Sequence, residues 1–297
     1  MTVEPTAAGS GSNGKLGAFY ELTKPGVTLL VVLTSAAGFY LGSSAGLVDL
    51  VLFLHTLVGT VLLSAGAATL NEFIEREEDG KMKRTRNRPL PSGRLGAREA
   101  AVFGGTLIVV GSLYLALLTN ILAASLGVAT IVVYLLVYTP LKKKTSICTA
   151  VGAVPGAMPT LIGWAAARGH LDFQAWVLFG ILFAWQFPHF LSIAWIYRND
   201  YQRAGFTMLP PADTEGRKTC GQILAFIALL LGLSVVPATS GLTGMVYLIG
   251  ALLLGLAFLW YGFEAALNRS TASARHVLLA SVAYLPLLLI LMVIDKR

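Results

Sequence analysis

Apolar residues in this chain form long runs separated by short polar stretches. Most runs are roughly 18 to 22 residues long, about what a helix needs to cross the hydrocarbon core of a bilayer. The strands of a membrane barrel would instead appear as alternating segments of about ten residues. The pattern therefore predicts an all-α, polytopic membrane protein with a bundle of about nine transmembrane helices. The nine runs are Val27–Leu41, Leu50–Leu70, Ala100–Leu118, Leu122–Pro140, Ile147–Ala166, Phe173–Trp195, Gly221–Pro237, Thr243–Phe263 and Val277–Ile294.

The first 14 residues, MTVEPTAAGSGSNG, contain no apolar run and lack the basic start and apolar core of a signal peptide. We expect residues 1–14 to be a disordered tail and residues 15–297 to form one transmembrane domain. The first apolar run would then be its own insertion signal. This favours a bacterial cytoplasmic membrane as the location.

Composition and charge agree with a membrane protein and predict its orientation. The chain is 56% hydrophobic and 12% charged, against about 25% charged in ordinary soluble domains. If the N-terminus is cytoplasmic, alternation through nine helices puts all but three of the 22 basic residues on the cytoplasmic side; Arg168, Lys296 and Arg297 are left outside. The positive-inside rule favours this topology, with the C-terminus outside. The net charge of +7 therefore reflects orientation and is no argument for nucleic-acid binding.

The densest charge lies in NEFIEREEDGKMKRTRNRPL, where the second run ends. Asn71, Glu75 and Asp79 recur every four residues, so they lie within about 80° of one another on a helical wheel. Carboxylate and amide oxygens on one face suit Mg²⁺, which proteins bind through a few carboxylates and substrate phosphates. The order of acidic before basic residues predicts a site for a metal ion and a diphosphate. The basic residues that follow can meet phosphate oxygens: Lys81, Lys83, Arg84, Arg86, Arg88 and Arg94.

Charges at a membrane surface are often only solvated, and the positive-inside rule alone accounts for the basic residues. It does not account for the carboxylates, because a cytoplasmic loop needs none. Glu72 sits beside the predicted metal-binding face, whereas Glu77 and Glu78 point elsewhere on the wheel and are interpreted as solvated. Lys142–Lys144, after the fourth run, add phosphate-binding charge on the same membrane face.

A second polar loop follows the sixth run, in FAWQFPHFLSIAWIYRNDYQRAGFTMLP. Pro188 lies inside that run and is expected to kink the helix. His189 could be a ligand of a haem iron, a proton carrier or a donor to a neighbouring helix, and the residues leave these three open. Asp200, flanked by Arg198 and Arg203, is a candidate second metal ligand.

Three segments together resemble the protohaem IX farnesyltransferases, a family of UbiA-type membrane prenyltransferases. They are NEFIEREEDGKMKRTRNRPLPSG, YTPLKKKTSICTAVGAVPGAMPTLIGWAA and WQFPHFLSIAWIYRNDYQRAGFTMLP, in this order, and the resemblance spans Lys24–Ile294. It implies nine transmembrane helices around a central cavity open near the cytoplasmic face. The implied reaction joins farnesyl diphosphate to a vinyl group of haem B, adds water to give haem O, and releases diphosphate. Haem O, or haem A made from it, would then serve terminal oxidases.

The resemblance also implies roles for residues. Asn71, Glu75 and Asp79 match the first acidic motif and would hold Mg²⁺ on the diphosphate, and Asp200 joins them as a catalytic residue. Many relatives in the wider superfamily carry aspartate where this chain has Glu72 and Glu75, and its second acidic run is reduced to Asp200; both departures fit one Mg²⁺ rather than two. Substrate binding is assigned to Lys83, Arg84, Arg88, Lys142, His189 and Arg198.

Mg²⁺ is the expected cofactor and haem B a substrate, with haem A synthase or terminal oxidase assembly factors as candidate partners. Two other interpretations stay open. One is a prenyltransferase of the same type that uses an aromatic quinone precursor as acceptor and needs no iron ligand at His189. The other is a transporter or haem carrier without chemistry, in which charged residues would lie deep within the spans; here they lie at helix ends.

Overall fold

The computed structural model describes residues 12–44, 48–210 and 213–297. Within these ranges nine helical segments are long and apolar enough to cross a membrane, which confirms the predicted all-α membrane fold. Shorter helices are α1 (Ser12–Leu22) and α9 (Arg198–Ala204). The nine segments are α2 (Pro25–Gly42), α3 (Leu50–Lys81), α4 (Ala97–Leu118), α5 with η1 and α6 (Ile121–Leu141), α7 (Cys148–Arg168), α8 (Phe173–Ile196), α10 with α11 (Arg217–Thr239), α12 (Met245–Asn268) and α13 (Thr271–Ile294).

Several helix boundaries differ from the sequence-based expectation by a few residues, and two differences bear on the charged end of the bundle. Residues 1–11 of the predicted tail lie outside the described residues, and Ser12–Gly14 are the first residues of α1, a helix that the apolar pattern did not predict. The second span continues beyond Leu70 to Lys81, so the acidic stretch is helical throughout. The backbone is therefore regular where the carboxylates occur, and this regularity keeps their four-residue spacing on one face.

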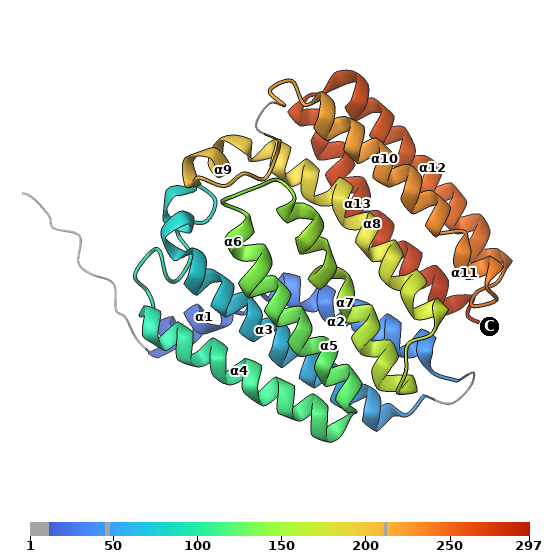
Figure 1. Cartoon of the computed structure of the whole chain (residues 1–297), viewed down its shortest axis with the longest axis horizontal. Coiled ribbons are helices and arrows are strands. Elements are labelled where there is room, and N and C mark those ends of the chain that lie inside the picture. The colour runs from blue at the N-terminus through green and yellow to red at the C-terminus, as the bar shows by residue number, and fades with distance from the viewer. Residues whose placement is uncertain (1–11, 45–47, 211–212) are drawn as a thin grey trace, which may run out of the picture.

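Contacts between successive spans close into a ring, because the last span, α13, also packs against the first, α2. Neighbours in sequence pack as pairs, notably α3 with α4, α7 with α8, and α12 with α13. α2 packs against α3, α7 and α13, and thereby joins the two halves of the bundle. α9 and the longer loops gather at one end of the bundle, and the C-terminus lies at the other (Figure 1). The charged loops are thus all at the end that we predicted to be cytoplasmic.

α2 and α7 approach each other unusually closely. A side chain at Gly163 would overlap the carbonyl oxygen of Ser35, and one at Gly38 would overlap the carbonyl of Thr160. Small residues that let backbones approach are the common device of helix packing in membranes, where lipid is as apolar as the helices themselves. This contact fixes the position of α7, which forms one wall of the central cavity described below.

The fourth span changes from α-helix to π-helix near the charged end. α5 (Ile121–Val132) is followed by η1 (Val133–Tyr138) and α6 (Thr139–Leu141). Pro140 has no N–H to donate, and the Thr139 hydroxyl donates 2.8 Å to the carbonyl of Tyr134 nearby. The wider turn aligns Tyr134 and Tyr138, whose rings stack at 5.6 Å. Such π-helical turns occur frequently at functional sites.

At the opposite end the chain terminus closes the ring. Lys296 donates to the carbonyls of Tyr40 and Ser43 at the end of α2, at 2.5 and 2.7 Å. Arg168, the last residue of α7, donates 2.6 Å to the carbonyl of Gly42. Basic side chains therefore satisfy the carbonyls that the end of α2 leaves without helical partners.

Candidate active site

Four polar side chains are buried at the charged end of α3. Asn71, Glu72, Glu75 and Asp79 are each exposed for 5% or less of their surface. Burial of ionised carboxylates is strongly unfavourable unless cations and hydrogen-bond donors compensate for it. The predicted face of Asn71, Glu75 and Asp79 is therefore present, and Glu72 belongs to the same buried cluster.

Three basic residues from separate parts of the chain supply the compensation. Lys24, just before α2, donates 3.0 Å to Asn71 Oδ1 and lies 3.7 Å from Glu72 Oε1. Lys142, after α6, contacts both oxygens of Glu75 at 2.7 and 3.0 Å.

Arg88, in the loop after α3, donates 2.8 Å to Asp79 Oδ2, and its Nε lies 3.6 Å from Glu72 Oε1. The predicted phosphate ligands Arg88 and Lys142 thus converge on the predicted metal ligands. A bound anion would find three cations already assembled at this point.

The charge states of these cations follow from their surroundings. Burial and the nearby Arg88 guanidinium lower the pKa of Lys24 to about 8. Burial disfavours the charge on Arg88, but Asp79 and Glu72 outweigh it and raise the pKa of Arg88. Burial likewise opposes the charge on Lys142, yet Tyr138 and Glu75 raise its pKa above the ordinary lysine value. Arg88 and Lys142 are therefore fully charged at neutral pH.

Two carboxylate oxygens in the cluster keep free lone pairs. Glu72 Oε2 and Asp79 Oδ1 are buried and have no hydrogen-bond partner among the described residues. Hard, unpartnered oxygens next to phosphate-binding cations are the donor set that suits Mg²⁺. No three histidine, cysteine, aspartate or glutamate side chains cluster as a metal site in the described part of the chain. The two unpartnered oxygens thus fit an ion for which substrate phosphates would supply most of the remaining ligands.

A cavity of about 290 Å³ lies directly below the cluster and contains the Lys24 side chain in its lining. Its walls come from α2, α3, α5, η1, α7 and α8, and they are mostly apolar. Tyr134, Tyr138 and Phe190 give it aromatic faces, and Gln186 is a buried polar residue within it. The arrangement can hold a charged head at the cluster and an apolar chain beneath it.

Five of the six residues of the predicted phosphate-binding run lie outside this cluster. Lys81, Lys83, Arg86 and Arg94 are exposed. Arg84 is also exposed; it donates 3.2 Å to the hydroxyl of Tyr201 and lies 5.0 Å above the ring of Tyr197. Arg84 therefore connects the loop after α3 to α9. Arg88, in contrast, contacts the carboxylates directly.

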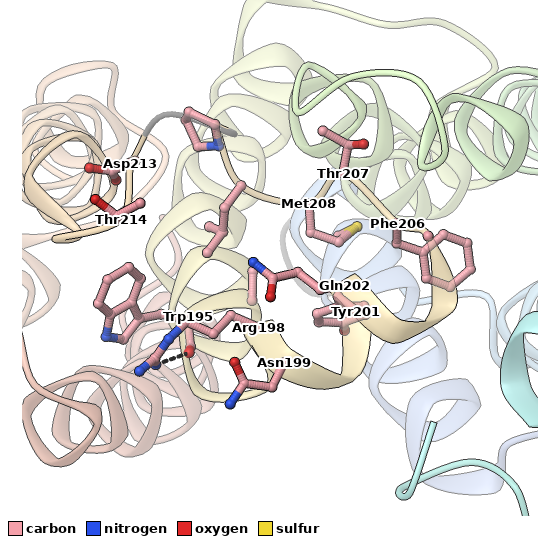
Figure 2. A pocket seen from close by; sticks show the side chains of 14 residues that line it. Trp195, Arg198, Asn199, Tyr201, Gln202, Phe206, Thr207, Met208, Asp213 and Thr214 are labelled. Carbon is pink, nitrogen blue, oxygen red and sulfur yellow. Dashed lines mark hydrogen bonds between the residues drawn. The ribbon is translucent and has the colours of Figure 1, made fainter. Parts of the chain in front are cut away.

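The second polar region forms a different cavity, of about 470 Å³, around α9. Figure 2 shows Arg198 beside Trp195, with Asp213 on the opposite wall. Arg198 donates 2.9 Å to the carbonyl of Trp195 and lies 4.7 Å above its ring. Asp200 is paired with Arg203 within α9. The structure thus gives Asp200 and Arg198 local partners and does not bring them into the α3 carboxylate cluster.

His189 lies on the side of α8 that faces α13. Its Nδ1 is 2.8 Å from the hydroxyl of Ser281, and its ring stacks on Trp185 at 4.9 Å. Gln186 and Phe190 lie on the side of α8 that lines the central cavity. Among the three roles left open for His189, this geometry corresponds to hydrogen bonding with a neighbouring helix.

Sequence reasoning overlooked Lys24 and Gln186 as parts of this site and placed Glu72 only beside it. Lys24 is the charge immediately before the first span, and Gln186 is a polar residue inside an apolar run; both signals were present in the sequence. Glu78, interpreted as solvated, is buried against Lys143 at 2.5 Å. Glu77 is exposed, as expected.

Comparisons with known proteins extend this description. The model of the UbiA prenyltransferase family matches residues 31–289. A protein of Solibacter usitatus named protoheme IX farnesyltransferase is 49% identical over 286 residues, covering 94% of this chain and 98% of the relative. A solved structure of digeranylgeranylglyceryl phosphate synthase has a TM-score of 0.79 and 20% identity, over 95% and 98% of the two chains. A UbiA homolog from Archaeoglobus fulgidus, bound to DMAPP and Mg²⁺, has a TM-score of 0.67 and 16% identity, over 92% and 98%.

Proposed function

Because this chain belongs to the UbiA prenyltransferase family and is thus an integral membrane prenyltransferase, we propose that it joins the farnesyl group of farnesyl diphosphate to a vinyl group of haem B. Water adds in the same reaction to give haem O, and diphosphate is released. The observation that carries the proposal is the buried cluster of carboxylates and cations above an apolar, partly aromatic cavity. The choice of haem B as acceptor rests on the name of the 49% identical relative.

The charged cluster accounts for the departure of diphosphate. Arg88, Lys142 and Lys24 neutralise the charge that develops on the leaving group, and they are held in place before substrate binds. Preorganised cations of this kind lower the barrier because they need not reorient during the reaction. Bound Mg²⁺ would supply further neutralisation, held by Asp79 and Glu72 through their unpartnered oxygens and by Asn71 and Glu75.

The cavity accounts for the fate of the allylic cation that ionisation produces. Tyr134, Tyr138 and Phe190 present aromatic faces, which attract cations, and the apolar walls limit premature attack by water.

The roles of the remaining predicted site residues are proposals of the same kind. Lys83, Arg84 and Arg198 are basic residues at the same membrane end for the haem propionates or the incoming diphosphate, and Asp200 orders α9 through Arg203. His189 acts on haem positioning indirectly, because its bond to Ser281 holds α8, and with it the cavity wall, against α13.

The proposed location is a bacterial cytoplasmic membrane, with the N-terminus in the cytoplasm and the C-terminus outside. The distribution of basic residues supports this orientation, because they concentrate at the end of the bundle that carries the charged loops. Farnesyl diphosphate would then enter from the cytoplasm. Haem A synthase or oxidase assembly factors are the proposed recipients of the product.

The test is mass spectrometry of haems extracted from membranes that contain the chain or its Asp79→Ala variant. We expect haem O with the native chain and a loss of at least 100-fold with the variant, an order of magnitude typical for removal of one preorganised electrostatic group. Glu77→Ala is the matched control, since Glu77 is exposed on the same helix. Normal haem O with Asp79→Ala would refute the assignment of the site. Farnesylation of a hydroxybenzoate instead of haem B would identify the acceptor as a quinone precursor.

A further inference from the structure

The side-chain amide of Gln186 is buried in the wall of the central cavity and held in one orientation. Gln186 is exposed for 3% of its surface. Its Nε2 donates 3.0 Å to the carbonyl of Ala153 on α7 and 3.1 Å to the carbonyl of Leu182 on α8. Both N–H groups are thereby used. The orientation of the amide follows, because only its nitrogen can donate to two carbonyls.

The amide oxygen has no donor among the described residues. Oε1 lies against Gly156, where a Cβ atom would overlap it, and both residues line the cavity. The glycine therefore leaves room for the oxygen at this wall. The oxygen therefore keeps its lone pairs available at the cavity wall, and a hydrogen-bond donor bound in the cavity could use it as an acceptor.

Gln186 Oε1 lies at the depth in the bundle where the reacting carbon atoms are expected. Tyr138 packs against Gly152, one turn before Gly156 on α7, and Thr139 accepts a hydrogen bond from Asn71. Gln186 is therefore about one helical turn, roughly 5 Å, below the level of the charged cluster. With diphosphate held by the cluster, the first carbons of the prenyl chain and the bond they form would lie at this depth.

We propose that Gln186 Oε1 binds the water molecule that supplies the hydroxyl group of the product, an inference that rests on the proposed function. The bond between C1 of the prenyl chain and diphosphate breaks, and its electron pair leaves with diphosphate. The vinyl π electrons form the bond from the terminal vinyl carbon to C1, which leaves a cation on the vinyl carbon attached to the porphyrin. A lone pair of the water forms the new C–O bond, and one water proton passes to the departing diphosphate.

The amide oxygen orients the bound water for attack on the cation. As an acceptor, Oε1 takes a hydrogen bond from the water and directs an oxygen lone pair away from itself, into the cavity. Tyr138 lines the same cavity, and its hydroxyl is the candidate for a second polar contact; bound water usually has two to four. Without this water the cation would instead lose a proton from the neighbouring carbon and form an alkene, a product lighter by the mass of one water.

The experiment therefore measures a product ratio. Membranes with the native chain, Gln186→Met or Gly156→Ala are incubated with haem B and farnesyl diphosphate, and hydroxylated and dehydrated farnesyl haems are separated by liquid chromatography and mass spectrometry. Gln186→Met removes the acceptor at similar volume, and Gly156→Ala displaces it. We expect both variants to raise the dehydrated fraction at least tenfold.

Two further variants complete the comparison. Gln186→Glu should keep a ratio near that of the native chain, because a neutral carboxylic acid offers a donor to Ala153 and an acceptor to the water. Gly180→Ala, on the same helix, is the control; its methyl group would meet Leu233 at an ordinary 3.7 Å.

The other possible outcomes contradict either the role proposed for Gln186 or the proposed function. An unchanged ratio in Gln186→Met and Gly156→Ala overturns the proposal, as does loss of both products from inserted variants, because the water acts only after the carbon–carbon bond has formed. A hydroxyl that carries no label after reaction in heavy-oxygen water also overturns it. If the native chain forms neither farnesyl haem, the proposed function is wrong instead.

Discussion

Glu75 and Lys142 form the most enclosed ion pair of the site, with side chains exposed for only 6% and 12%. The pair joins α3 to the end of the fourth span, so it has a structural as well as an electrostatic consequence. In a buried pair the removal of one partner is far more harmful than the removal of both, because a single charge is left without compensation.

Lys142→Met should lower the free energy of unfolding by about 3–5 kcal/mol, because the Glu75 carboxylate stays buried without its cation. The double variant Glu75→Gln with Lys142→Met should recover a large part of this loss. Neither variant should recover prenyl transfer, since both lack the cation for the diphosphate. Thermal unfolding in detergent and a transfer assay measure the two effects separately.

The exposed pair of Lys15 and Glu99 provides the control for this cycle. Lys15→Met should leave the unfolding temperature unchanged, since solvated pairs contribute little. Equal effects of Lys15→Met and Lys142→Met would show that burial does not determine the strength of these pairs.

For single residues, the sequence predicted side-chain positions that depend only on the regular spacing of a helix. It missed residues that tertiary packing brings together from distant parts of the chain. The spacing of Asn71, Glu75 and Asp79 was sufficient because α3 is straight through this stretch. Lys24 reaches the same cluster from 47 positions away, and no local periodicity reports such a contact. The direction of His189 depends on which neighbour packs on each side of α8, and the sequence of α8 alone does not contain this information.

Among the elements, α7 is the one whose position depends most on small residues. Gly163 contacts the backbone of α2 so closely that no side chain fits between the helices. Gly163→Ala should therefore separate α2 from α7 and destabilise the protein by about 1–3 kcal/mol, as overpacking of a tight core usually does.

Thermal unfolding of purified Gly163→Ala in detergent measures this effect. Gly105→Ala on α4 is the matched control, because a Cβ there meets nothing within 4 Å. A Gly163→Ala protein as stable as the control would mean that the two helices can separate without loss.

α10 begins at a buried carboxylate that stabilises its first turn. Asp213 accepts hydrogen bonds from the backbone N–H of Lys218 and Thr219 and from the Thr219 hydroxyl, at 2.6 to 3.0 Å. Although burial opposes the charge, these bonds lower the pKa of Asp213 below its ordinary value of 3.8. The unfolded chain therefore binds a proton at Asp213 more readily than the folded chain does.

Stability from Asp213 should be complete above about pH 4 and should decline as the pH falls towards the lower pKa of the folded state. Asp213→Asn should be less stable at neutral pH by about 1 kcal/mol, the usual value of a capping side chain. The difference from the native chain should shrink in acid. Unfolding temperatures measured between pH 3 and 7 test this, and a difference that stays constant over the range contradicts it.

For the whole molecule, the number of spans followed from hydropathy because only helices of that length can satisfy their backbone in lipid. The short helix α1 and the π-helical turn η1 were not predictable in the same way. α1 is too short and polar to span, and η1 (VYLLVY) continues the apolar run of the α-helix that precedes it. The hydropathy pattern did not predict the cavity either, because faces of six separate helical elements form it.

The proposed orientation can be tested by thiol labelling of the whole protein. In a chain with Cys148 and Cys220 replaced by alanine, Ser92→Cys and His170→Cys place single exposed thiols at opposite ends of the bundle. An impermeant reagent should label His170→Cys in intact spheroplasts and Ser92→Cys only after lysis. The reverse pattern would invert the topology and place the charged cluster outside the cell.

The bond between Lys296 and the end of α2 has a consequence for biosynthesis. The ribosome delivers α2 to the membrane first, yet the carbonyls of Tyr40 and Ser43 receive their donor from Lys296, 256 and 253 positions later in the chain. Until Lys296 has been synthesised, the end of α2 lacks this hydrogen-bond donor, and α2 lacks its neighbour α13. In nascent chains interrupted before Lys296, these two carbonyls of α2 therefore lack their donor, and the surface of α2 that α13 covers is exposed to lipid. Both features distinguish incomplete chains from complete ones for membrane quality control.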